Sequence, residues 1–403
     1  MSFRLLIISS MYPGYLTSFY KNHSEVKDLD YTKHHETLLN DSTEFVASYT
    51  RTFKRLGIKA DCIIDNDLCL QNKWKEINRI KNATKKELLY HQVKEFNPEI
   101  LWIEDFRFID KNLLGRIRTD IKSIKLIIAY HCSPYNSVII EKFRDIDFVI
   151  TCTPGLKKEF EDNGLRSYLV YHGFDCDLLS RIKEGSSEAE NSIIFTGSLF
   201  QGDGVHGQRI ELIEGFLKEN IALSLYLNLE SRYKILAKKF IYLVNRLLTD
   251  LKLERLKDPF PIFEYINTPF RNYSDLLIKA NWGPVFGLEM YQLLSMSGIV
   301  LNIHGEVAGN YAGNMRLFEA TGVGSCLLTD NKSNLIELFD PAGEVVAYDN
   351  IGDCIRKAKW LLENREKRKE IALAGQKRTL NSHRVEDRCR QIIEIIKNEL
   401  NMK

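Results

Sequence analysis

A short segment near the C-terminal end carries residues that are suited to binding a phosphorylated sugar. Residues 314–322 read Asn-Met-Arg-Leu-Phe-Glu-Ala-Thr-Gly, and an apolar run follows at 323–330. We predict a helix that ends at the glycine and leads directly into a strand. A helix N-terminus presents unpaired N–H groups and partial positive charge, so Asn314 and Arg316 would help to bind a phosphate. Glu319, one turn further in, could accept hydrogen bonds from sugar hydroxyls.

A second group that could hold phosphates follows an apolar run at 192–196. We place Gly197 and Ser198 in the loop after this predicted strand, and further glycines lead to Arg209 at the start of a helix. Glycine lets a ligand approach the backbone closely, and a guanidinium can bind a diphosphate through two parallel hydrogen bonds. The alternative is a glycine-rich loop with a surface arginine. Together with the helix at Asn314, the loop favours a site for a nucleotide-diphosphate sugar.

Two candidates in the first half lie where predicted strands end. His131 follows the run 126–130 and Asp105 follows the run 100–104. Ligands of doubly wound sheets bind at the carboxyl ends of the strands. Histidine titrates near neutral pH and can take a proton from an acceptor hydroxyl, so we choose His131 over Asp105 as the catalytic residue. A structural histidine that caps the loop is the alternative.

Gly14 lies in the loop after the first predicted strand and His304 follows a later one, so both are further candidate site residues. For His304 and for the pair His172-Gly173, a structural role fits at least as well. The chain lacks a G-x-G-x-x-G fingerprint, which argues against an NAD enzyme. The histidines have no metal-ligand spacing, so we predict no metal and no cofactor other than the sugar nucleotide as co-substrate.

The elements that must position these residues alternate along the chain. Short apolar runs are separated by longer polar segments that suit helices, which predicts an α/β protein with parallel sheets covered on both faces. A helix after Thr153 is well marked, because Thr153 can cap it, Pro154 suits its first position and Gly164 can close it. The predicted strands are 5–9, 60–64, 100–103, 126–130, 148–152 and 168–171, then 192–196, 223–227, 299–303, 325–329 and 344–347.

Composition limits the class of protein. The chain has 403 residues, of which 44% are hydrophobic and 27% charged, and its net charge is +2. This length suits two or three domains, and the near-neutral charge argues against nucleic acid as a partner. The eight cysteines form no C-x-x-C pair, which is typical of free thiols in a reducing cytoplasm rather than of disulfides or a zinc site. Neither a signal peptide nor a long apolar span is recognisable, so we expect a cytoplasmic protein.

We expect an N-terminal domain of residues 1–180, a polar linker at 183–191 and a second domain of residues 190–386. A helical insertion at about 231–281 interrupts the second domain. Part of it has helical apolar spacing and many lysines and arginines around it. Two interpretations stay open: a basic amphipathic helix on an anionic membrane surface, or a solvated helix whose apolar stripe packs on the domain. The second is the commoner case. The stripe consists of Leu236, Phe240, Leu243, Val244, Leu247, Leu248 and Leu251.

The segment that contains Asn314, Arg316 and Glu319 resembles the donor-binding helix of GT-B glycosyltransferases. Its Asn-Met-Arg ahead of the glutamate is most similar to the CgeB-like (spore maturation protein) group, and the order of Gly197, Ser198 and Arg209 resembles family-four-like enzymes. The similarity is strongest over residues 284–396. Glu319 stands where the family has the second glutamate of its E-x7-E motif, whereas Tyr311 replaces the first.

The resemblance implies two Rossmann-like domains that face a cleft, with a last helix at about 387–403 crossing back onto the first domain. It also implies a metal-independent, hexosyltransferase-like enzyme whose C-terminal domain binds the donor. The N-terminal domain would present a glycan, lipid-linked or protein acceptor, as in surface polysaccharide or glycoconjugate synthesis at the inner face of the membrane. The alternatives are a nucleotide-sugar epimerase on the same fold and a non-catalytic sugar-binding or scaffold subunit.

Overall fold

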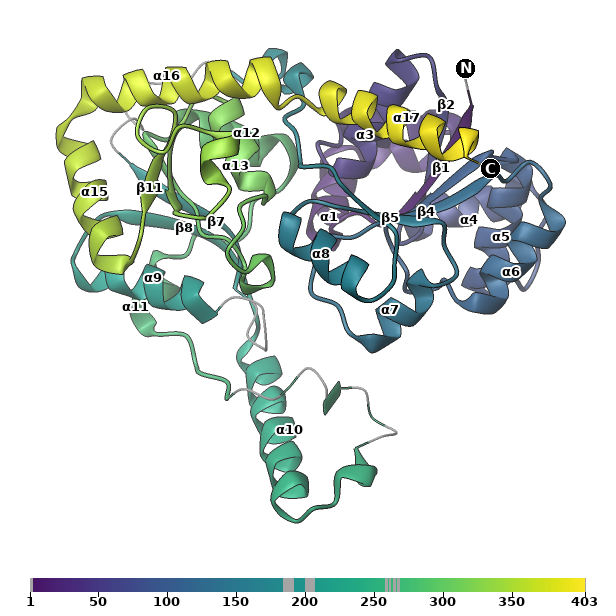
Figure 1. Ribbon diagram of the computed structural model, residues 1–403, viewed down its shortest axis with the longest axis horizontal. Coiled ribbons are helices and arrows are strands. Elements are labelled where there is room, and N and C mark those ends of the chain that lie inside the picture. The colour runs from purple at the N-terminus through teal and green to yellow at the C-terminus, as the bar shows by residue number, and fades with distance from the viewer. Residues whose placement is uncertain are drawn as a thin grey trace.

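The computed structural model contains two parallel sheets, each covered by helices, and a long helix that extends away from both (Figure 1). It describes residues 3–183, 192–199, 207–257, 260, 262–263, 266 and 269–402. All of the predicted linker except Lys183 lies outside the described residues, and so does the glycine-rich stretch 200–206.

The first sheet has six parallel strands in the order β2-β1-β3-β4-β5-β6. Every residue of β3, β4 and β5 is buried, as expected for apolar runs that helices cover on both faces. The six predicted strands are confirmed with small shifts at their ends. Their bounds are β1 (Arg4–Ser9), β2 (Lys59–Ile64), β3 (Ile100–Ile103), β4 (Leu126–Tyr130), β5 (Phe148–Thr151) and β6 (Ser167–Leu169).

The helices around this sheet mostly begin at a side chain that caps them. The predicted start of α8 is confirmed, because the Thr153 hydroxyl accepts the Leu156 N–H at 3.3 Å and Pro154 occupies the first position. Gly164 follows the helix with φ of +76°, a conformation that favours glycine. The elements are α1 (Pro13–Asn22), η1 (Ser24–Lys27), α2 (Tyr31–Asp41), α3 (Phe45–Arg55), α4 (Leu68–Ile77), α5 (Lys85–Phe96), α6 (Lys111–Asp120), α7 (Ser137–Phe143), α8 (Pro154–Asp162) and η2 (Cys176–Ser180).

The second sheet has five parallel strands in the order β11-β10-β9-β7-β8. Gly197 and Ser198 were expected in a loop, but they are paired within the sheet, opposite Leu227 and Asn228 of β8. The strand continues in extended form past the apolar run at 192–196, so hydrophobicity alone places its end too early. The strands are β7 (Ile193–Leu199), β8 (Leu223–Leu229), β9 (Ile299–Leu301), β10 (Cys326–Asp330) and β11 (Val346–Tyr348).

Helices cover the second sheet on both faces, and one of them leaves it. The helix predicted from Asn314 is confirmed as α13, and the glycine expected to end it is its last residue. The elements are α9 (Gly207–Lys218), α10 (Arg232–Asp250), η4 (Glu254–Leu256), α11 (Asp275–Ala280), α12 (Gly287–Met296), η6 (Glu306–Ala308), α13 (Met315–Gly322), α14 (Leu335–Leu338), α15 (Ile351–Glu363), α16 (Arg365–Ser382) and α17 (Val385–Asn401).

The two sheets repeat one topology. In each, the first strand of the unit lies between the second and the third, so the strand order reverses between β1 and β3 and again between β7 and β9. Ligands of open parallel sheets bind outside the carboxyl ends of the strands at such a reversal. The fold therefore offers two binding edges, one in each half.

The last helix joins the two halves (Figure 1). Where the chain returns, the Val385 N–H donates to the carbonyl oxygen of Phe174 at 2.9 Å. Beyond that point α17 buries Cys389, Ile392 and Ile396 in the core of the first sheet. The predicted crossing is confirmed, and the helix begins two residues earlier than expected.

One pair of cysteines corrects the expectation of free thiols. Cys132 and Cys152 form a disulfide, with their Cα atoms 5.7 Å apart. They follow β4 and β5, which are neighbours in the sheet. Twenty residues separate them in the sequence, so spacing alone did not show that two adjacent strands end side by side. The other six cysteines are free.

Candidate active site

The N-terminal tip of α13 is open to a ligand. Asn314 precedes the helix, but its side chain does not cap it. Instead its Nδ2 donates to Oδ1 of Asn302 at 2.8 Å. Asn314, Met315 and Arg316 are partly exposed, whereas the helix is buried from Leu317 onward. The first N–H groups of a helix need partners from outside it, and among the described residues no side chain caps this tip. An anion could supply those partners.

His304 holds the chain that leads to this tip. The Gly313 N–H donates to Nε2 of His304 at 3.3 Å, so Nδ1 carries the proton and donates to Asp330 at 2.6 Å. Burial acts to raise the pKa of Asp330, but the hydrogen bond from His304 and the nearby positive charges outweigh it and lower that pKa. His304 was predicted as a residue of the cleft. Its buried ring and two bonded nitrogens make it a positioning residue for the tip instead.

Arg316 and Glu319 are bound to each other on α13. The guanidinium lies 2.8 Å from the carboxylate, and their side chains are only 15% and 9% exposed. Tyr291 donates to the other carboxylate oxygen at 3.1 Å. Glu319 is therefore buried and fully partnered rather than an exposed helical carboxylate. Arg316 must share its donors between Glu319 and any phosphate at the tip.

Arg209 approaches the same place from α9. Its Nη1 donates to the carbonyl oxygen of Ser198, at the carboxyl end of β7, with a distance of 3.3 Å. Burial, reinforced by the positive charge of Arg316, lowers the pKa of Arg209 to about 10. The positive charges of Arg316 and Arg209 therefore oppose each other, and an anion between the two guanidinium groups would reduce this repulsion. Gly197, with φ of +153°, precedes this carbonyl, and a β-carbon on it would lie 3.8 Å from the ring of Phe195.

The reversal of strand order in the first half gathers carboxylates. Ser9, the last residue of β1, donates to Glu104 after β3 at 2.5 Å, and burial raises the pKa of Glu104 to about 7. The predicted Asp105 accepts from Ser10 at 2.7 Å and pairs with Arg107. Burial acts to raise the pKa of Asp105, but these partners outweigh it and lower that pKa. Asp105 is an ion-paired group, and Glu104 beside it is the better proton acceptor.

Glu44 and Tyr12 complete this edge. The Tyr12 N–H donates to the Glu44 carboxylate at 3.0 Å, and burial raises the pKa of Glu44 to about 8. Desolvation of the Tyr12 hydroxyl, with the charges of Glu44, Glu319 and Glu104, raises its pKa to about 12, although the side chain as a whole is 65% exposed. Tyr12 therefore lies within the field of carboxylates from both halves. Sequence reasoning missed Tyr12, Glu44 and Glu104, and only the position of Glu104 at the end of a strand next to Asp105 could have indicated one of them.

Glycines bring the two edges together. A β-carbon on Gly14 would lie 2.3 Å from the ring of Phe286, and one on Gly313 would lie 2.4 Å from the carbonyl oxygen of Cys152. A β-carbon on Gly155 would lie 2.8 Å from Tyr311. Each contact joins the first half to the second. Gly14 thus lies at the contact between the two halves, and its role as a site residue stays a prediction. Tyr311 packs at this contact instead of supplying a carboxylate.

His131 has the wrong surroundings for a strong base. Its ring packs against Tyr135, Phe143 and Phe160, and burial lowers its pKa to about 4. At neutral pH the imidazole is uncharged and weakly basic, so it is better suited to hydrogen bonding than to accepting a proton. His172 is also buried, with Nδ1 3.1 Å from the Tyr130 hydroxyl. It is a structural residue beneath α17.

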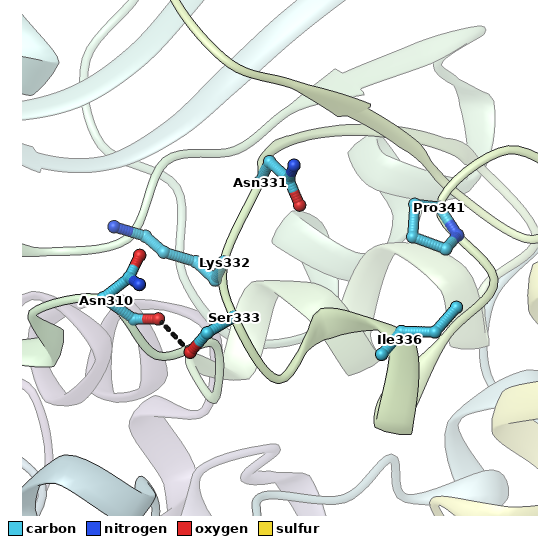
Figure 2. Close-up of a pocket in the computed structure, with 6 residues that line it drawn as sticks. All are labelled: Asn310, Asn331, Lys332, Ser333, Ile336 and Pro341. Carbon is cyan, nitrogen blue, oxygen red and sulfur yellow. Dashed lines mark hydrogen bonds between the residues drawn. The ribbon is translucent and has the colours of Figure 1, made fainter.

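A separate hollow of about 400 Å³ opens beside the loop after β10 (Figure 2). Ser333 donates to the carbonyl oxygen of Asn310 at 2.8 Å across its floor, and Lys332 lies 3.3 Å from Asp330. None of the predicted site residues lines it. The lining consists of Asn310, Asn331, Lys332, Ser333, Ile336 and Pro341.

The prediction of no metal stays a prediction. Two groups among the described residues have the ligand types and spacing for an ion: Cys132 and Cys152 with His172, and His35 with Asp61 and Cys62. The first includes the disulfide. Neither contains a residue of the predicted donor site.

Two sheets of one topology, joined by a returning C-terminal helix, define the GT-B fold. Residues 252–394 match a family model described as Glycosyl transferase-like. A glycosyltransferase from Rickettsia africae ESF-5 is similar in structure, with a TM-score of 0.56, 12% identity and 99% of each chain covered.

Anabaena HepE, solved with UDP and glucose, gives a TM-score of 0.53 at 13% identity over 98% of this chain and 100% of that one. Sucrose-phosphate synthase from Thermosynechococcus elongatus gives 0.57 at 8% identity, covering 99% and 100%. No curated protein matches the sequence significantly. At identities this low, the structural similarity establishes the fold alone. The CgeB-like resemblance stays a prediction.

Proposed function

We propose that the protein is a glycosyltransferase that moves a sugar from a nucleotide-diphosphate donor to an acceptor hydroxyl. The observation that carries this proposal is the uncapped tip of α13, which follows β9 and has Arg316 in its first turn, while Arg209 binds the Ser198 carbonyl at the end of the neighbouring strand β7. Two cations and a helix N-terminus at the reversal of a parallel sheet suit a diphosphate. The match to the Glycosyl transferase-like model supports the same function.

The donor site would act mainly through charge. As the bond between sugar and diphosphate breaks, negative charge grows on the leaving oxygens. Arg209, Arg316 and the N–H groups after Asn314 would stabilise that charge from fixed positions, which is how preorganised dipoles lower a barrier. Glu319 would give up part of its interaction with Arg316 and accept hydrogen bonds from the ribose hydroxyls. This set of groups needs no metal for the diphosphate.

The acceptor would bind at the edge that carries Glu104 and Glu44. A pKa of about 7 for Glu104 and about 8 for Glu44 suits proton transfer near neutral pH. If the reaction inverts, Glu104 would take the proton of the attacking hydroxyl. If it retains configuration, the carboxylates would orient the hydroxyl. His131, with its pKa of about 4, would contribute a hydrogen bond at most.

A glycan, lipid-linked or protein acceptor on the cytoplasmic side, as in surface polysaccharide or glycoconjugate synthesis, fits this reaction. HepE was solved with UDP-glucose, which makes UDP-hexoses the first donors to test. In its more specific form, the proposal is that the protein is a CgeB-like enzyme that uses hexosyl donors.

The test is a thermal-shift panel of UDP, GDP, CDP, ADP and dTDP. A ligand that binds only the folded protein raises its melting temperature by mass action, so one nucleotide should stand out. The sugar donors of that nucleotide are then tried with acceptors, and release of nucleoside diphosphate is measured. Binding without turnover would favour a scaffold subunit, and conversion of the donor sugar would favour an epimerase. No shift with any of the five would contradict the donor site.

A further inference from the structure

Helix α10 carries an apolar stripe that the described residues leave largely exposed. Five side chains of the predicted stripe are 56–67% exposed. The commoner interpretation, in which the stripe packs on the domain, therefore does not hold for these five. The helix points away from both sheets (Figure 1). Single exposed apolar residues are ordinary, but a continuous row is typical of a docking surface. We call this row, which consists of Leu236, Phe240, Leu243, Leu247 and Leu251, the α10 stripe.

The orientation of α10 keeps the stripe outward. Ile235 is buried in the core of the second half. Nδ2 of Asn245 donates to the carbonyl oxygens of Phe263 and Ile266, at 3.1 and 2.9 Å. Ile235 and Asn245 thus fix the sides of the helix away from the stripe. At the edge of the stripe, Lys239 donates to Asn272 at 2.9 Å. Rotation that buried the stripe would break these contacts, so the exposure is built into the packing.

Apolar exposure continues beyond the end of the helix. Leu253 and Leu256, around the short η4 turn, are more than two-fifths exposed, as are Phe260 and Ile262. These residues follow α10 in the chain and add further exposed apolar side chains to this segment. In the described part of the chain, no helix has the length and apolar character to cross a bilayer.

Positive charge accompanies this surface. Residues 232–257 contain eight lysines and arginines and two acidic residues, a net charge of +6 in a chain whose total is +2. Arg232, Lys239 and Arg246 recur every seven residues, so they lie along one edge of the α10 stripe. An apolar row bordered by cations is the pattern of a helix that lies in the interface of an anionic membrane.

A second copy of the chain fits the charges less well. Leu236, Phe240, Leu243 and Leu247 have the spacing of a two-stranded coiled coil, but Asp250 would occupy the next seam position. Arg232, Lys239 and Arg246 would then flank the seam with no acidic residue to face them, so two copies would repel. Anionic headgroups would attract the same residues.

We propose that α10, with Leu253, Leu256, Phe260 and Ile262 after it, docks this protein on an anionic lipid surface. The α10 stripe would enter the boundary between headgroups and acyl chains, and the bordering cations would contact phosphates. The inference goes beyond the proposed function and does not depend on it. If both hold, docking would bring a lipid-linked acceptor to the edge at Glu104.

The test is co-sedimentation of the full chain with vesicles of phosphatidylcholine, with and without phosphatidylglycerol. We expect binding that requires the anionic lipid and weakens as salt is added. Phe240→Glu and Leu243→Glu should each reduce the partition coefficient about tenfold or more. Leu373→Glu, on an exposed position of α16, is the matched control and should bind like the parent chain.

A charge variant separates lipid docking from simple apolar adhesion. Arg232→Glu, Lys239→Glu and Arg246→Glu together should lower binding to the anionic vesicles by about a hundredfold. Circular dichroism and melting temperature establish that each variant is folded. Equal binding to both vesicle types, or binding that Phe240→Glu does not weaken, would overturn the proposal. So would a dimer, seen by light scattering without lipid, that Phe240→Glu dissociates.

Discussion

Gly14 lies so close to Phe286 that a β-carbon on it would be 2.3 Å from the phenylalanine ring. Gly14 belongs to α1 in the first half and Phe286 precedes α12 in the second. The Tyr12 ring lies near Phe286 as well, with ring centres 6.3 Å apart. The absence of a side chain at position 14 therefore allows the approach of the two halves at the edge where donor and acceptor would meet.

We predict that Gly14→Ala impairs transfer without impairing donor binding. The added methyl must displace Phe286, a change that costs about 1–3 kcal/mol when a core is overpacked. Nucleoside diphosphate affinity, measured by calorimetry, should stay within about twofold while turnover falls. The control is Gly115→Ala in α6, where a β-carbon meets nothing within 4 Å.

A double-mutant cycle with Phe286→Ala tests the contact directly. Removing the ring should restore much of the turnover that Gly14→Ala loses. If the two effects simply add, the contact between Gly14 and Phe286 does not limit the reaction.

The second prediction concerns the buried cation Arg209. Arg209→Gln should weaken nucleoside diphosphate binding about ten- to a hundredfold, because a hydrogen bond to a charged group contributes about 1.5–3 kcal/mol. Its stability should be unchanged or higher, since burial and Arg316 disfavour the charge at this position. Calorimetry and thermal melting measure the two effects. Arg356→Gln, at a guanidinium that is 76% exposed, should change neither. Equal affinity of Arg209→Gln and the parent chain would remove Arg209 from the donor site.

The sequence predicted the framework of this fold because local signals determine it. Apolar runs, continuous in β3, β4 and β5 and alternating with polar residues in β8, mark the strands, and Thr153 with Pro154 marks the start of α8. The segment from Asn314 was placed correctly because a helix that ends at a glycine before a buried strand leaves little freedom. Gly197 was misplaced, since glycine in extended backbone and glycine in a loop look alike in a sequence.

The chemistry of single side chains depends on contacts between distant segments. His131 looked like a base because it follows a strand, but its pKa is set by Phe143 and Phe160, which lie on other elements. Glu104 was passed over for its neighbour Asp105. Its raised pKa follows from burial next to β1, and the strand order that places it there cannot be read from local patterns.

The third prediction separates helix stability from phosphate binding at one position. Asn314→Asp places a carboxylate at the tip of α13, where it complements the helix dipole, but it removes the hydrogen bond that Nδ2 of Asn314 donates to Asn302. The two effects oppose each other, so the melting temperature should change little. The new charge would repel a diphosphate, so affinity measured by calorimetry should fall at least about tenfold. Asn136→Asp, at the capping residue of α7, is the matched control and should leave affinity unchanged. A folded variant that binds as tightly as the parent chain would show that no phosphate occupies this tip.

The last prediction uses the raised pKa of Glu104. Because the folded protein holds this proton up to about pH 7 and the unfolded chain releases it near 4.5, the carboxyl group favours folding at low pH. That contribution is lost as the pH rises from about 4.5 through 7, and above 7 the buried charge costs up to about 3 kcal/mol. Gln resembles the protonated acid and can still accept from Ser9. Glu104→Gln should therefore match the parent chain in stability at pH 5 and exceed it at pH 8.

The same variant should lose turnover, since an amide cannot take the proton of an acceptor hydroxyl. Denaturant unfolding at the two pH values and a pH–rate profile measure the two effects together. Glu141→Gln, at a carboxylate that is 69% exposed, should change neither. Greater stability at pH 8 with full activity would confirm the buried charge but remove Glu104 from the reaction. Equal stability at both pH values would show that the carboxylate is not held in the buried position from which its acceptor role is inferred.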